Sequence, residues 1–186
     1  DNPQRALTTV AQLVGASRVL KGFNDVLAAE CLQIAKDVYE QTQVSGWAEN
    51  AKLQAAIELW LTTNEQSYLD FVLDRQEMVL RSIGRGGWMA VRLAQRLTTV
   101  KDKRAAKFLA ALRTALVGYK KQLDAQSAET PYGVPYRPSI WGAGWDIQCF
   151  GFEYYFLTSA YPDIFPPETV YNALNFVLGC HPGSNN

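Results

Sequence analysis

The sequence predicts an all-α fold, and three features lead to that prediction. Apolar residues recur at the i, i+3, i+4 spacing of an amphipathic helix along most of the 186 residues, whereas no stretch alternates with the period of two typical of a half-buried strand. Short segments containing glycine or proline separate the helical stretches. A weak repeat, at residues 55–73 and 151–178, pairs an aromatic-rich helix ending in Leu-Thr with a second amphipathic helix. We therefore expect about eight helices.

The first half of the chain holds four apolar stretches at helical spacing. Gly22 is expected to end the first helix, and Asn24 is suited to begin the second because its side chain can cap a backbone amide. The stretches cover residues 7–20, 27–38, 53–61 and 69–79.

The second half begins with Gly84-Arg85-Gly86-Gly87, which we expect to interrupt a pair of helices. Residues 108–123 follow as a long amphipathic helix, and residues 170–178 match the helical template at every apolar position. Between these two lies a different kind of segment, residues 129–144, where Pro131, Pro135 and Pro138 exclude a regular helix. This loop is rich in aromatic residues, and we expect function to be located there.

Composition and charge narrow the classes of partner. The chain has 18 basic and 18 acidic residues, so its formal net charge is zero, and it has no basic stripe to contact a phosphate backbone or an anionic membrane. Nucleic acid is therefore not an expected partner. No apolar run approaches the roughly 20 residues needed to span a bilayer. The N-terminus has neither an initiator Met nor the layout of a signal peptide, which favours a processed or truncated chain.

The cysteines and the histidine predict no metal site. Cys31, Cys149 and Cys180 are widely spaced and form no C-x-x-C pair, so we expect buried, small apolar residues rather than a disulfide framework. His181 is the single histidine and is expected to be a turn residue, since one imidazole cannot form a ligand cluster. No cofactor is expected.

Two segments of the last third resemble a known family. Residues 132–146 read Tyr-Gly-Val-Pro-Tyr-Arg-Pro-Ser-Ile-Trp-Gly-Ala-Gly-Trp-Asp, and residues 171–179 read Tyr-Asn-Ala-Leu-Asn-Phe-Val-Leu-Gly. The first resembles the loop of family 9 glycoside hydrolases that leads to a Trp-Gly pair, here Trp141-Gly142. The second resembles the helix that precedes the family's Asn-Pro turn, although Cys180-His181 replaces the usual Arg-Asn. The motifs are specific only from about Tyr132 to Gly183. The Ala-Ala-Ile-Glu-Leu hairpin at residues 55–59 also resembles the family's mid-barrel repeat.

The resemblance implies an (α/α)6 barrel enzyme, a cellulase or endoglucanase, that hydrolyses β-1,4-glucan-type polysaccharides or oligosaccharides with inversion. It also implies a secreted or periplasmic protein. Inversion needs a base and an acid about 6.5–9.5 Å apart. In the family the base comes from an Asp-x-x-Asp motif near the start of the domain, and the acid is a Glu beyond the Asn-Pro turn. This sequence contains neither region, so we expect residues 1–186 to form a single-domain fragment that has no catalytic residue and no turnover by itself.

Five residues of the loop region are the predicted substrate-binding residues. Trp141 lies beside Gly142, where the missing Cβ lets a ligand approach, and its indole can stack on a sugar ring. Tyr132, Tyr136 and Arg137 lie on the same loop, and Trp145 begins the next helix. Arg137 can donate hydrogen bonds to sugar hydroxyls or pair with a carboxylate. Core packing is the alternative role for the aromatic residues.

Two carboxylates near this loop are expected to be structural. Asp146 suits the positive end of a helix dipole. Glu153 lies two turns further, among aromatic residues, where burial can raise the pKa of a carboxylic acid and give it the character of a general acid. A salt-bridged or partly exposed structural role remains the more common one for such a residue.

Other interpretations of a helical-hairpin array stay open. An α-solenoid could bind a peptide on its concave face, but the long Pro/aromatic loop speaks against it. A related toroid, such as a polysaccharide lyase, would need a Tyr/His or Arg pairing that a lone histidine supports poorly. A truncated barrel would expose the apolar flanks of its terminal helices, so we also expect self-association or low stability.

Overall fold

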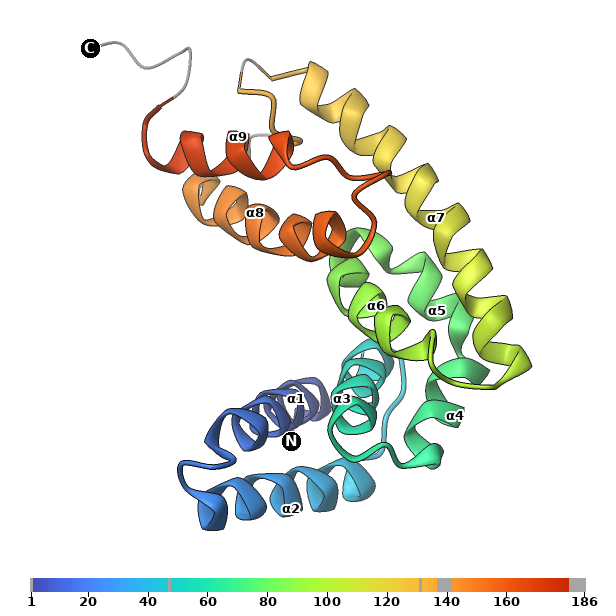
Figure 1. Cartoon of the computed structure of the whole chain (residues 1–186). Helices are drawn as coiled ribbons and strands as arrows, with labels where there is room; N and C mark the ends of the chain where they lie inside the picture. Colours follow the sequence, from blue (N-terminus) through green and yellow to red (C-terminus); the bar gives the residue numbers. More distant parts are fainter. Residues whose placement is uncertain (1, 47, 131, 137–141, 181–186) are drawn as a thin grey trace. The chain divides into compact units, whose positions relative to one another are not determined.

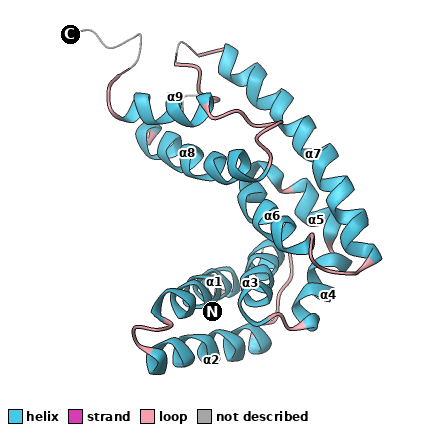
Figure 2. Ribbon diagram, viewed as in Figure 1, coloured by secondary structure: helices cyan, strands magenta, loops and turns pink. Residues whose placement is uncertain are grey.

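Nine α-helices make up the regular structure of the described residues in a computed structural model of the chain (Figures 1 and 2). These residues are 2–46, 48–130, 132–136 and 142–180. The chain divides into two units, residues 1–79 and 80–186. The helices are α1 (Pro3–Leu20), α2 (Asp25–Gln41), α3 (Ala48–Thr63), α4 (Gln66–Asp74), α5 (Gln76–Arg81), α6 (Ile83–Leu97), α7 (Lys103–Ala128), α8 (Ala143–Ala160) and α9 (Glu168–Val177).

Side-chain caps fix where several helices begin. The Asn2 side-chain oxygen accepts a hydrogen bond from the Arg5 backbone amide at 3.1 Å, and Pro3 occupies the first turn of α1. Asn24 caps α2 in the same way, accepting from the Leu27 amide at 3.1 Å, which confirms the predicted cap. Gly22 adopts a left-handed backbone with φ of 87° in the turn between α1 and α2.

The first unit is built around α3. This helix packs against α1 and α4 and also contacts α2. Every residue from Ala55 to Trp60 is buried, because neighbouring helices cover α3 on more than one side. Leu7, Val10 and Val14 of α1 supply the facing apolar stripe at helical spacing.

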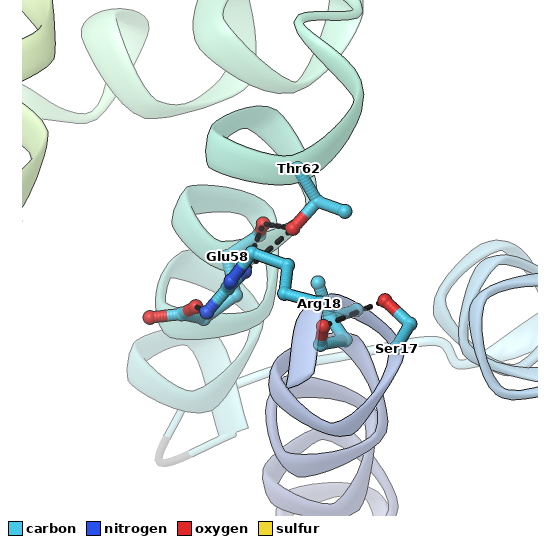
Figure 3. Close-up of polar contacts among 5 residues, drawn as sticks. Ser17, Arg18, Glu58 and Thr62 are labelled. Carbon is cyan, nitrogen blue, oxygen red and sulfur yellow. Dashed lines mark hydrogen bonds and ion pairs between the residues drawn. The ribbon is translucent and has the colours of Figure 1, made fainter. Parts of the chain in front are cut away.

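One charged side chain lies inside this unit. Glu58 projects from the buried run of α3, and its carboxylate forms an ion pair with the Arg18 guanidinium of α1 (Figure 3). Arg18 also donates to the Thr62 hydroxyl at 2.5 Å and to the Glu58 backbone carbonyl at 3.4 Å. The Arg18 side chain is 33% exposed and the Glu58 side chain 6% exposed. The pair thus joins α1 to α3 at a site where the carboxylate has little access to water.

The second unit is built around the packed helices α6 and α8. Helix α6 contacts both α7 and α8, and α8 pairs with α9. Figure 1 shows α8 and α9 side by side along their lengths. The core is apolar, and its largest fully buried side chains are Phe108, Leu112 and Leu116 of α7, Leu93 and Leu97 of α6, Tyr154 and Ile147 of α8, and Phe165 of the α8–α9 connection.

The predicted break at residues 84–87 is wrong. Gly84, Gly86 and Gly87 lie within α6. A Cβ added at Gly84 would meet Tyr119 at 3.6 Å, and one added at Gly87 would meet Leu157 at the same distance. Gly84 therefore lies on the side of α6 that faces α7, and Gly87 on the side that faces α8. Tertiary packing of the helix outweighs the cost of about 1 kcal/mol that each interior glycine imposes.

The predicted burial of the cysteines holds for one of the three. Cys31 is buried on α2, whereas Cys149 and Cys180 are exposed. Cys149 lies on α8, which packs against α6 and α9 but also carries exposed apolar side chains such as Phe152. Helical spacing alone could not distinguish this position from a core position, because α8 is apolar on nearly every side.

Candidate functional site

The candidate site is the described part of the loop after α7 together with the first turns of α8. The Thr130 hydroxyl donates to the Val134 carbonyl at 2.8 Å, and the Tyr136 amide donates to the same carbonyl at 2.8 Å. Gly133 supplies the left-handed conformation, with φ of 64°, that this tight turn requires. These contacts give the loop a defined shape without regular secondary structure.

The loop is held against the α8–α9 pair by an apolar cluster. Val134 is buried with Ile147 of α8 and Ala173 of α9, and Tyr132, Tyr136, Phe150 and Phe176 pack around these three residues. The Tyr132 ring meets the Phe176 ring edge-to-face, with 5.0 Å between centroids. Both predicted binding tyrosines are therefore partly buried and contribute to packing.

One polar contact also fixes the loop to α9. The Asn172 side-chain amide donates to the Gly133 carbonyl at 3.3 Å. A Cβ at Gly133 would lie only 2.8 Å from the Asn172 side-chain nitrogen, so any larger residue would displace this contact. The position needs glycine for both its backbone conformation and its space.

Trp145 is the most accessible of the three predicted site residues that the structure describes. It lies in the first turn of α8, just after Gly142, whose φ of 92° sets the direction in which the helix leaves the loop. The Trp145 side chain is 73% exposed. An exposed indole on a rigid helix is suited to stack against the apolar face of a ligand ring. Trp141 and Arg137, the other two predicted residues, lie outside the described residues.

Two carboxylates, Asp146 and Glu153, follow Trp145 along α8. Asp146 is exposed in the first turn, where the helix dipole favours a negative charge. Glu153 is partly buried, and burial raises the pKa of its carboxyl group. Burial, together with the nearby Glu153 charge, raises the pKa of Tyr119 on α7 to about 12. No salt bridge to Glu153 is found among the described residues.

Glu153→Gln is expected to stabilise the protein near pH 7 but not near pH 4. Burial raises the folded-state pKa of Glu153 above its unfolded value, so the protonated carboxyl group is compatible with folding at low pH. As the pH rises through the folded pKa, the buried group must ionise and the free energy of unfolding falls. The amide has no charge to desolvate, so the variant avoids that loss. Urea unfolding of both proteins at several pH values measures the difference. If the difference in unfolding free energy between the two proteins stayed constant with pH, desolvation of the Glu153 carboxylate would not be its cause.

The described part of the chain contains no group of three or more His, Cys, Asp or Glu residues that could hold a metal ion. None of its helices is long and apolar enough to cross a membrane.

Comparison with solved structures identifies a similar fold. The chain is similar to the crystal structure of a metagenome-derived glycoside hydrolase family 9 endoglucanase, with a TM-score of 0.67 and 17% sequence identity. The similarity covers 98% of this chain and 38% of that chain. It confirms the predicted fold class, all-α and of the partial (α/α)6 barrel type, and this chain spans well under half of the endoglucanase. No protein-family model and no curated protein matches the sequence.

Proposed function

We propose that this chain is the substrate-binding part of a glycoside hydrolase that acts on β-1,4-glucan-type polysaccharides or oligosaccharides with inversion. The observation that carries the proposal is the fold similarity to a family 9 endoglucanase over nearly the whole chain. The Tyr132–Asp146 motif supports the same family. An extracellular or periplasmic location belongs to the same proposal.

Within this function, Trp145 provides a stacking platform for a sugar ring. Its exposure and its place on the first turn of a helix support the role, since a rigid aromatic surface loses little entropy on binding. Trp141 and Arg137 are proposed to contact the same glucan chain. Tyr132 and Tyr136 are proposed to contribute through the outer edges of their rings, because their inner edges pack on the α8–α9 pair.

Trp145→Ala is expected to weaken the binding of cellohexaose about tenfold, because losing one stacked aromatic face removes about 1.4 kcal/mol of binding free energy. Isothermal titration calorimetry with wild type and variant measures the change. Phe23→Ala is the matched control, since Phe23 is 91% exposed in the other unit and should not affect binding. Equal affinities of wild type and Trp145→Ala would remove Trp145 from the site.

Hydrolysis is tested separately from binding. The catalytic base and acid are proposed to lie in segments outside these 186 residues, so the chain alone should release no reducing sugar from a soluble β-glucan. Absence of cello-oligosaccharide binding, with helicity intact by circular dichroism, would contradict the proposed function as a whole.

A further inference from the structure

Two cations of unit 1 lie on a group of aromatic rings contributed by α2 and α4. Tyr39 of α2 meets Tyr68 of α4 edge-to-face, with 5.3 Å between ring centroids, and it meets the Phe71 ring at 6.3 Å. The Lys52 ammonium of α3 lies 4.8 Å from the centre of the Tyr39 ring. The Arg75 guanidinium, which follows α4, lies 3.9 Å from the centre of the Phe71 ring. Cation–π contacts therefore hold both charges on the same aromatic group.

The two cations are close enough to repel each other. Burial, followed by the positive charge of Arg75, lowers the pKa of the Lys52 ammonium. The Arg75 charge also acts on the Tyr39 phenol, where it opposes the rise in pKa that burial causes. Like charges disfavour one another, and an anion placed between them removes this penalty. The local field of Lys52 and Arg75 thus favours a negatively charged ligand.

Neither cation is neutralised by the protein. No carboxylate in the described part of the chain forms an ion pair with Lys52 or Arg75. Lys52 donates to the Thr42 carbonyl at 2.9 Å, and Arg75 donates to the Phe71 carbonyl at 3.4 Å. Because an ammonium and a guanidinium each carry several donors, most of these N–H groups remain available to a ligand.

Two phenol groups add further donors. Neither the Tyr39 nor the Tyr68 hydroxyl has a hydrogen-bond partner among the described residues, and neither oxygen is fully enclosed by protein atoms. Burial raises the pKa of both phenols, so they stay protonated near neutral pH. Two carboxylates act on the Tyr68 phenol. Glu65 is paired with Lys36, and Glu40 is exposed, so water screens its charge.

This set of donors matches the chemistry of an oxyanion. A guanidinium presents a planar fork that fits a carboxylate or a phosphate, and an ammonium adds a second positive charge. Phenol hydroxyls donate to the remaining oxygens. A metal ion would be repelled by the two cations, and a neutral sugar would leave their charges uncompensated.

We propose that Lys52 and Arg75, with the hydroxyls of Tyr39 and Tyr68, bind an oxyanion that is either a phosphate group or the carboxylate of an acidic sugar. The two cations neutralise the ligand, and the two hydroxyls orient it. All four residues belong to unit 1, whereas Trp145 belongs to unit 2. The oxyanion site is therefore a separate property from the proposed glucan binding at Trp145.

Nuclear magnetic resonance titration of the 186-residue chain with inorganic phosphate, at constant ionic strength, tests the proposal. The backbone amides of residues 71–75 are expected to shift with a dissociation constant of about 1 mM, since water partly screens an open site. Lys52→Met and Arg75→Met are each expected to raise that constant at least fivefold. Lys21→Met, which removes an exposed charge from the same unit, is expected to leave it unchanged.

A conservative variant separates binding from packing. Lys52→Met also loses the hydrogen bond to the Thr42 carbonyl, which contributes to the fold. Tyr68→Phe keeps the ring and removes only the hydroxyl, so it should retain the wild-type melting temperature and weaken phosphate binding about threefold.

Parallel titrations with glucuronate and with glucose identify the source of the oxyanion. Tighter binding of glucuronate than of phosphate supports the site as a contact for an acidic sugar, and tighter binding of phosphate supports it as a phosphate site. Glucose, which lacks the charge, is expected to shift none of these amides.

Two outcomes overturn the proposal. The first is a wild-type chain whose amides at residues 71–75 respond to neither phosphate nor glucuronate. The second is phosphate binding that Lys21→Met weakens as much as Arg75→Met does, which would indicate a response to net charge alone. Loss of cellohexaose binding in a chain that still binds phosphate would contradict the proposed function and leave the oxyanion site standing.

Discussion

Arg18→Met is expected to lower the free energy of unfolding by about 3 kcal/mol. The Glu58 carboxylate is almost fully buried in the apolar run of α3, and the Arg18 guanidinium forms an ion pair with it. Removing one partner of a buried ion pair costs about 3–5 kcal/mol, because the remaining charge keeps its desolvation penalty. We take the lower end of this range, since Arg18 is one-third exposed and Glu58 has further contacts.

The double variant Arg18→Met/Glu58→Met separates charge pairing from loss of packing. It removes the buried carboxylate as well, so most of the lost stability should return, as with buried pairs that are replaced by apolar residues. Arg113→Met is the matched control, because Arg113 and Asp163 form an exposed pair in unit 2. It should leave urea unfolding unchanged. A loss in the double variant equal to that in Arg18→Met would show that the guanidinium stabilises the fold by packing alone.

The helices of unit 1 were predictable because their signals are local. Apolar residues at positions 7, 10 and 14 lie on one side of α1, and Asn24 caps α2 within one turn. The break at Arg75 between α4 and α5 was not predicted, since the apolar spacing continues through it. In α6 the error was the opposite one: its glycines predicted a break where a helix forms. Contacts with α7 and α8 stabilise this helix, although local propensity disfavours it.

The candidate site was only partly predictable for a related reason. Loop composition indicated where Tyr132 and Trp145 lie, but not which of them would be accessible. The partial burial of Tyr132 comes from packing against α9, to which the loop is also joined by the hydrogen bond between Asn172 and Gly133, residues 39 positions apart. The Arg18–Glu58 pair spans 40 positions and was missed as well. Its one sequence signal is a single acidic residue inside the otherwise apolar run from Ala55 to Leu61.

The connection between α8 and α9 contains a core residue that helical periodicity cannot reveal. Phe165 is fully buried although it lies in an irregular segment, and its ring meets the Tyr154 ring edge-to-face with 5.4 Å between centroids. Its backbone amide donates to the Tyr161 carbonyl at 2.9 Å, which completes the turn after α8. Phe165 thus fixes the connection to the core of unit 2.

Phe165→Ala is expected to lower the free energy of unfolding by about 4 kcal/mol, since truncating a buried Phe costs about 3–5 kcal/mol in lost burial and cavity formation. Phe165→Leu, which keeps most of the volume, should cost less than half as much. Urea unfolding followed by circular dichroism measures both, with Phe23→Ala as the exposed control. Because Phe165 holds the segment that leads into α9, amide hydrogen exchange should accelerate in α9 before it does in α7. Equal, small losses for Phe165→Ala and Phe23→Ala would mean that this turn does not depend on its buried ring.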